Sequence, residues 1–203
     1  MLVAAVTPAP HFLFVIHSHG VSTMRLCTRL LAAAAFAACI VTPALAQTGE
    51  ALLRTEGKFK PIPNPEHAAP KSMVYKVSWD VTVGPEKPDS VTSGFRVPAN
   101  FLMMTDTSGV PRKNVHLAIV VHGTATRSLL QNDAYKAQTG VNNPNIAILE
   151  ALNAAGVQVI VCGQALLNRN VPREKLLPFV KVSISATLAR AVLGAQGYTI
   201  MTP

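Results

Sequence analysis

The chain has 203 residues, which is enough for one domain with a substantial core but not for two of ordinary size. Apolar residues make up 49% and charged residues 14%, and the net charge of +8 is spread without a run of Lys or Arg. Few aromatic side chains are available to stack on bases, so the composition argues against a nucleic-acid partner.

Residues 24–46 have the pattern of a secretory signal peptide. Two arginines and an apolar run over residues 30–41 precede Ala44-Leu45-Ala46, which is a small-x-small cleavage site. The apolar run is short for a membrane span, so stable membrane insertion is not expected. We therefore expect translation to start at Met24, residues 1–46 to be absent from the mature chain, and the protein to be periplasmic.

Cleavage after Ala46 removes Cys27 and Cys39 and lowers the formal charge from +8 to +6. Cys162 then remains alone, so the mature domain has no internal disulfide and depends on its core for stability. Residues 47–71 contain four prolines between positions 61 and 70. This segment is expected to be a tether without regular structure, followed by the folded domain over 72–203.

Residues 73–83 alternate between apolar and polar side chains, with Trp79 on the apolar face. A period of two with one polar face predicts a strand that is open to solvent on one side, at an edge of the sheet. Asp89 or Ser90 is then expected to cap a helix that runs toward Met104.

A continuous apolar run over 116–121 predicts a second strand, and the segment 124–140 is expected to be partly helical. Asn143-Pro144 has the pattern of a helix cap followed by proline in the first turn. This helix is expected to end at Gly156 and to lead directly into a buried strand over 157–162.

The last part of the chain repeats this order. It has a strand over 180–184, then Ser185 as the cap of a helix over 186–196, then a short strand over 198–201. The apolar face expected for this helix consists of Leu188, Ala189, Val192 and Ala195. The alternation of strands and helices predicts an α/β domain with a mainly parallel sheet of about five strands.

Cys162 ends the buried strand at 157–162, which is where open α/β sheets carry ligands and reactive groups. The partial positive charge of neighbouring helix N-termini favours a thiolate at this position, and Gly163 leaves room for a second molecule to approach the sulfur. The competing interpretation is a buried cysteine that packs as a small apolar residue. Position alone leaves both interpretations open.

His122-Gly123 ends the preceding strand in the same manner. If the two strands are neighbours, His122 lies close enough to Cys162 to stabilise a thiolate or to relay a proton. The alternative is a histidine that is hydrogen-bonded in a turn. Arg127, Asn132 and Gln164 follow strands at the same edge and are candidate ligands for an anion such as a sulfur oxyanion, or else solvated side chains.

Several common catalytic patterns are absent from the sequence. It contains no Gly-x-Ser-x-Gly nucleophile elbow, which argues against an α/β-hydrolase, and no Gly-x-Gly-x-x-Gly, Walker A or Cys-x-x-Cys sequence. The histidines that follow the signal peptide do not have the spacing of metal ligands. We therefore expect neither a metal nor another cofactor.

Six short motifs, taken together and in order, resemble the DsrE/DsrF-like family in its exported branch, from about Lys71 to the end of the chain. They are Val120-Val-His-Gly123, Asn143-Pro144, Gly156-Val157, Val161-Cys-Gly-Gln-Ala165, Ser185-Ala186 and Gly197-Tyr198. The resemblance implies a flavodoxin-like or Rossmann-like three-layer fold and assembly into homo-oligomers or hetero-oligomers. It also implies sulfur relay, in which a cysteine carries sulfane sulfur as a persulfide between partner proteins.

On this resemblance Cys162 is the sulfur-accepting residue. His122 matches a motif position of the family, but its expected role as a thiolate partner rests on its place at the end of the preceding strand. Gly123, Gly163 and Gln164 occupy motif positions beside them and are expected, with Asn132 and Arg127, to bind the ligand. The partners would be sulfur-donor and sulfur-acceptor proteins or small sulfur compounds. The rival hypothesis is an oligomeric small-ligand-binding module without catalysis, in which Cys162 is structural.

Overall fold

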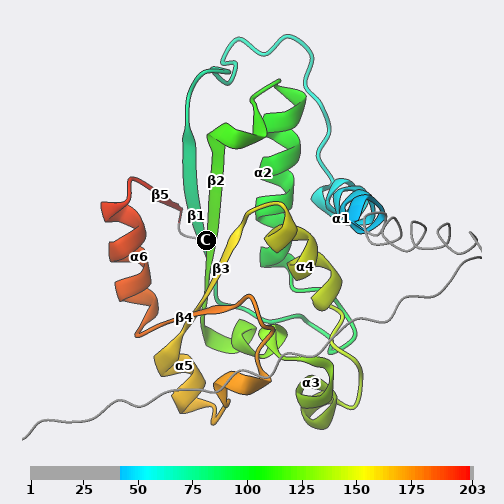
Figure 1. Ribbon diagram of the computed structural model, residues 1–203, viewed down its shortest axis with the longest axis vertical. Coiled ribbons are helices and arrows are strands. Elements are labelled where there is room, and N and C mark those ends of the chain that lie inside the picture. The colour runs from blue at the N-terminus through cyan, green and yellow to red at the C-terminus, as the bar shows by residue number, and fades with distance from the viewer. Residues whose placement is uncertain (1–41, 202–203) are drawn as a thin grey trace, which may run out of the picture. The chain divides into compact units, whose positions relative to one another are not determined.

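The computed structural model describes residues 42–201, with side chains from residue 49 onward. Five strands form one sheet in the order β4-β3-β2-β1-β5, and every neighbouring pair is parallel (Figure 1). The strands are β1 (Tyr75–Val81), β2 (Val115–Val121), β3 (Gln158–Cys162), β4 (Lys181–Ser183) and β5 (Thr199–Met201). The predicted α/β fold with a mainly parallel sheet is confirmed.

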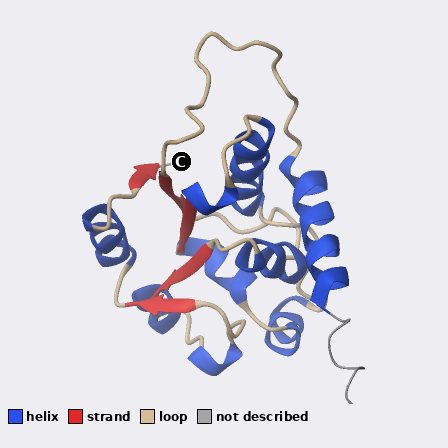
Figure 2. Ribbon diagram, turned by 45° about the horizontal axis from the view of Figure 1, so that its top comes forward, coloured by secondary structure: helices blue, strands red, loops and turns tan. Residues whose placement is uncertain are grey.

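Helices cover both faces of the sheet, so the domain has three layers (Figure 2). Helices α2 and α4 lie on one face, α1 packs on α2 and α4, and α6 lies on the opposite face. The helices are α1 (Thr42–Gly57), α2 (Arg96–Thr107), α3 (Asn132–Thr139), α4 (Ile146–Ala154), α5 (Gly163–Asn168) and α6 (Ala186–Ala195). None of the helices described is both long enough and apolar enough to span a bilayer.

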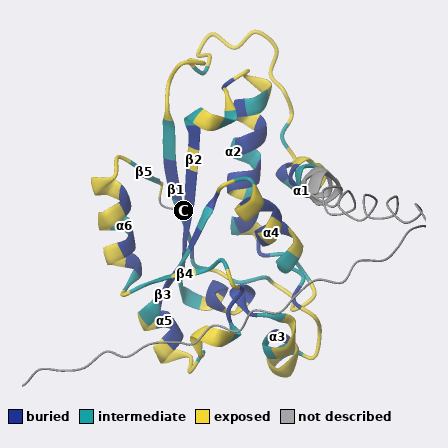
Figure 3. Cartoon of the chain, viewed as in Figure 1, coloured by how far each residue is buried: buried dark blue, intermediate teal, exposed yellow. Residues whose placement is uncertain are grey.

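Strand β2 lies at the centre of the sheet and is buried along almost its whole length (Figure 3). Leu117, Ile119 and Val121 belong to the core under α2 and α4, whereas Ala118 and Val120 belong to the core under α6. A strand covered on both faces needs apolar side chains at successive positions, which explains the uninterrupted apolar run in the sequence.

The prediction that residues 73–83 form an edge strand open to solvent is wrong. Strand β1 lies between β2 and β5, and its polar face is covered by α6. Ser78 is fully buried there, and Asp80 and Lys76 have partners on or just after α6. The alternation was correct, but the polar side chains face another layer of the protein instead of water.

The prediction that residues 47–71 lack regular structure is wrong for the part that forms α1. Leu53 on this helix is buried, and the backbone at Gly57 lies close to Ala99 of α2. Glu56 accepts a hydrogen bond from Arg96 at 2.6 Å. Residues 58–71 have neither helix nor strand, as expected for the proline-rich part. Most of the predicted signal peptide lies outside the described residues.

Ser185 caps α6, as predicted, because its hydroxyl accepts a hydrogen bond from the backbone N–H of Leu188. The predicted buried face is only partly correct. Ala186, Ala189 and Leu193 are buried, whereas Leu188 and Val192 are exposed. The helix packs on the sheet through its small side chains, so the larger apolar residues are left on its outer side.

Asn143 is a buried connector and not the cap of α4, which begins at Ile146. Its Nδ2 donates to the carbonyls of Ser128 and Leu130 at 2.9 and 2.6 Å. Its Oδ1 accepts from the backbone and side-chain nitrogens of Asn145 at 3.0 and 2.9 Å. One amide therefore satisfies the polar backbone of two loops between β2 and α4, which explains its burial.

We predict that Asn143→Ala lowers the free energy of unfolding by about 2–3 kcal/mol, because buried carbonyls lose their donors. Denaturant unfolding monitored by circular dichroism measures the change. Asn153→Ala makes the same chemical change at an exposed position on α4 and should alter stability by less than about 0.5 kcal/mol. Equal effects of the two substitutions would contradict the connector role.

Candidate functional site

Cys162 is the last residue of β3 and is followed at once by the first turn of α5. The residue is 7% exposed, and it lies in the core between the sheet and α6, with Ala118, Val120, Ala165, Ala186, Ala189 and Leu193. The thiol is thus at the carboxyl edge of a parallel sheet, where the sequence predicted it, and it forms no disulfide.

A buried carboxylate, Asp80, lies on the same face of the sheet and joins three elements. Its Oδ2 lies 3.3 Å from Nε2 of His122, the residue that follows β2. Arg190 of α6 donates to the same oxygen through Nη1. The Asp80 side chain is 4% exposed, against 28% for His122 and 31% for Arg190. Asp80 is therefore screened from water by its two partners.

The register of the sheet brings His122 and Cys162 to corresponding positions. Val120 pairs with Ile160, and Val121 pairs with Val161, so His122 and Cys162 follow at the next step on each strand. Adjacent strands are about 4.8 Å apart. His122 and Cys162 each lie two residues beyond the paired residues Val120 and Ile160, so they are on the same face of the sheet as Val120, which faces α6. The two side chains thus leave neighbouring strands on the same face.

The two glycines predicted to bind ligand lie close to the backbone of neighbouring segments. Gly123 has a φ of +60°, and an added Cβ would lie 2.4 Å from the carbonyl oxygen of Thr82. At Gly163 an added Cβ would lie 2.7 Å from the carbonyl oxygen of Ser183. The end of β4 therefore occupies the space beside Gly163. Glycine fits here because a side chain would overlap the backbone of β4, and not because the position leaves room for a ligand.

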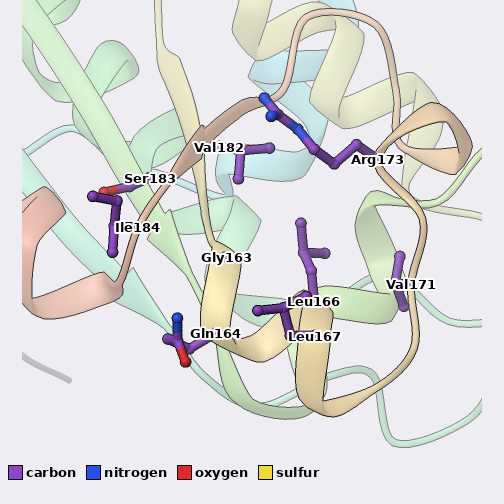
Figure 4. A pocket seen from close by; sticks show the side chains of 9 residues that line it. All are labelled: Gly163, Gln164, Leu166, Leu167, Val171, Arg173, Val182, Ser183 and Ile184. Carbon is purple, nitrogen blue, oxygen red and sulfur yellow. The ribbon is translucent and has the colours of Figure 1, made fainter.

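Gly163 and Gln164 line a groove of about 350 Å³ beside Cys162 (Figure 4). The groove lies between α5 and the end of β4, and its wall is mainly apolar, with Leu166, Leu167, Val171, Val182 and Ile184 and the charged side chain of Arg173. Ser183, the register partner of Cys162, also lines it. Gly163 follows Cys162 in the chain, but Cys162 is not part of the wall of the groove. Leu166, Val171 and Val182 of the wall belong to or pack against the core under α2 and α4, whereas Cys162 belongs to the core under α6.

Arg127 and Asn132, the other predicted ligand residues, have structural contacts on the segment between β2 and α4. The Oδ1 atom of Asn132 accepts a hydrogen bond from the backbone of Asn143 at 2.9 Å. Burial raises the pKa of Tyr135, and the positive charge of Arg127 opposes that increase. The contact of Asn132 joins the start of α3 to the segment before α4, and the predicted ligand-binding roles of Arg127 and Asn132 stay predictions.

Asp80 and Arg190 are the two site residues that sequence reasoning missed. Asp80 is the only acidic residue of β1, and Arg190 is the only charged residue of the apolar helix α6. An isolated charge in an apolar element is a signal for a buried pair, since an unpaired charge is costly to bury. No group of three or more acidic, cysteine or histidine side chains suited to a metal ion occurs among residues 42–201.

The model of the DsrE/DsrF-like family matches residues 80–203, which is more than half of the chain and includes the whole site. The chain belongs to the DsrE/DsrF-like family. Its sequence matches none of the curated proteins.

Two solved structures are similar to the chain at low sequence identity. One is the protein of unknown function MTH1491 from Methanobacterium thermoautotrophicum, with 17% identity and a TM-score of 0.45. The other is the ychN protein from E. coli, with 20% identity and a TM-score of 0.45. Each match covers 64% of this chain and 99% of the other.

We predict that Gly163→Ala lowers the free energy of unfolding by about 1–3 kcal/mol, because the new methyl group overlaps the carbonyl of Ser183. Gly194→Ala is the matched control. Nothing lies within 4 Å of an added Cβ there, and alanine favours the helix, so stability should rise by about 0.5–1 kcal/mol. Thermal unfolding of both variants gives the comparison, and a tolerated Gly163→Ala would show that β4 moves away readily.

Proposed function

We propose that this member of the DsrE/DsrF-like family is a sulfur-relay protein that carries sulfane sulfur as a persulfide on Cys162. The observation that carries the proposal is the position of the thiol at the carboxyl edge of the sheet, within the segment that the family model matches. The protein would act as a carrier more than as a turnover enzyme, because it takes and returns the same sulfur atom.

The proposed transfer is a pair of thiol exchange steps. The Cys162 thiolate attacks the outer sulfur of a donor persulfide, R–S–SH, so that a new sulfur–sulfur bond forms on Cys162 and R–S⁻ leaves. An acceptor thiolate then attacks the outer sulfur of Cys162–S–SH, which restores the Cys162 thiolate. The proton stays on the transferred sulfur in both steps, and no external oxidant or reductant is required.

The absence of a second cysteine near the site supports storage of the sulfur. A neighbouring thiol would attack the persulfide and release the outer sulfur as the protein formed a disulfide. Cys162 is the only cysteine after residue 39, so the domain over residues 72–203 has no such resolving thiol.

We further propose that the protein is exported, cleaved after Ala46 and oligomeric. Export is supported by the sequence pattern of residues 24–46, and oligomer formation by the exposed apolar side chains of Ile184, Leu188 and Val192 along and just before α6. The periplasmic product should begin at Gln47 in mass spectrometry and exceed the monomer mass in light scattering. An uncleaved or strictly monomeric product would contradict the corresponding part.

One observation favours the rival function, a ligand-binding module with a structural cysteine. Cys162 is only 7% exposed and belongs to a packed apolar cluster. Free cysteine often has this role. In that case the groove beside α5 would be the binding site, and the thiol would not react in the native protein.

The persulfide is tested by intact mass of the mature protein after exposure to a polysulfide donor. We expect the mass of one or more sulfur atoms to be gained, to be lost on addition of reductant, and to be absent in Cys162→Ser. Native alkylation with iodoacetamide should label the same residue. Labelling that appears only after denaturation, with no sulfur gained by the folded protein, would support the structural cysteine instead.

A further inference from the structure

The Asp80 pairing has a geometry that a purely structural ion pair would not need. Arginine and a carboxylate commonly pair through two parallel hydrogen bonds, which use both oxygens. Here Arg190 and His122 both approach Oδ2, and the buried Oδ1 has no hydrogen-bond partner. One carboxylate oxygen is thus shared between a cation and an imidazole, an arrangement that orients the imidazole.

We propose that Asp80 and Arg190 are positioning residues that hold His122 with its hydrogen on Nε2, so that Nδ1 accepts the proton of the Cys162 thiol directly or through one water. A carboxylate accepts hydrogen bonds and donates none, so the ring nitrogen that faces it carries the hydrogen. The other ring nitrogen then has a free lone pair. The role of this base rests on the function proposed above, in which Cys162 reacts as a thiolate.

Arg190 has a distinct part in this arrangement. A carboxylate that is as buried as Asp80 is costly to keep ionised without a cation beside it, and the guanidinium supplies that cation. Arg190 thereby holds in place the carboxylate that orients His122.

The proton movement balances within the site. The proton leaves Sγ of Cys162 and binds Nδ1 of His122, giving a thiolate and an imidazolium whose Nε2–H still faces Asp80. When R–S⁻ leaves the donor, the imidazolium returns the proton to it. Charged and titratable groups reach this corner from the three elements around His122, namely Asp80 from β1, Cys162 from β3 and Arg190 from α6. Lys76, at the other end of β1, is bonded to the carbonyl of Gln196.

The first readout is the tautomer of His122, measured by long-range ¹H–¹⁵N NMR on the mature protein. We expect the hydrogen on Nε2 alone in the wild type and distributed over both ring nitrogens in Asp80→Ala, which removes the acceptor that faces Nε2. A wild-type ring that carries the hydrogen on Nδ1, or an unchanged tautomer in Asp80→Ala, would overturn the proposal.

The second readout is the pH–rate profile of Cys162 alkylation by iodoacetamide. In Asp80→Ala and His122→Gln the rate should rise at higher pH than in the wild type, and at neutral pH it should fall, by about 100-fold in His122→Gln. His122→Gln leaves the Asp80–Arg190 pair intact, so it tests the base even if Asp80→Ala fails to fold. A wild-type profile in His122→Gln would show that the histidine takes no part.

Asp133→Ala is the matched control, because Asp133 is an exposed carboxylate that also pairs with a cation, Lys175, at 2.7 Å. It should leave the tautomer and the alkylation profile unchanged. The test separates this inference from the proposed function. Persulfide formation with no change of profile in Asp80→Ala would contradict only the positioning role, whereas the expected tautomers without persulfide formation would contradict only the carrier role.

Discussion

The pairing of one buried carboxylate, Asp80, determines how the layer on one face of the sheet is built. A charge on a central strand is costly to cover unless a partner compensates it. Arg190 provides that partner from α6, and His122 adds a second contact from the end of β2. The rotation of α6 is thus fixed by a charge and not only by apolar packing, which explains why Leu188 and Val192 remain exposed.

Helix α6 and the residue after it are bonded to both ends of strand β1. Near the carboxyl end of β1, Asp80 pairs with Arg190, and near the amino end Lys76 donates to the carbonyl of Gln196 at 2.9 Å. Gln196 follows the last turn of α6, where unpaired carbonyls favour a cation. Between these contacts Ala186 and Ala189 are small enough for the helix to lie close to the sheet. Polar residues set the position of the helix, and alanines allow the close approach.

The fold was predictable from sequence because its signals are local. Uninterrupted apolar runs identified β2 and β3, Ser185 identified the start of α6, and Gly156 identified the end of the helix before β3. The errors arose where the partner lies far away in the chain. Asp80 and Arg190 are 110 residues apart, so the polar face of β1 was assigned to solvent. Helix α1 was missed because its burial depends on α2 and α4.

The candidate site shows the same division between local signals and distant partners. Cys162 and His122 were found because each ends a recognisable strand, whereas Asp80 and Arg190 acquire meaning only when β1, β2 and α6 come together. Gly163 was expected to leave room for a second molecule, but the carbonyl of Ser183 occupies that space. In the proposed relay, a donor would reach the buried thiol beside the partly exposed His122 and Arg190, the two side chains that Asp80 contacts.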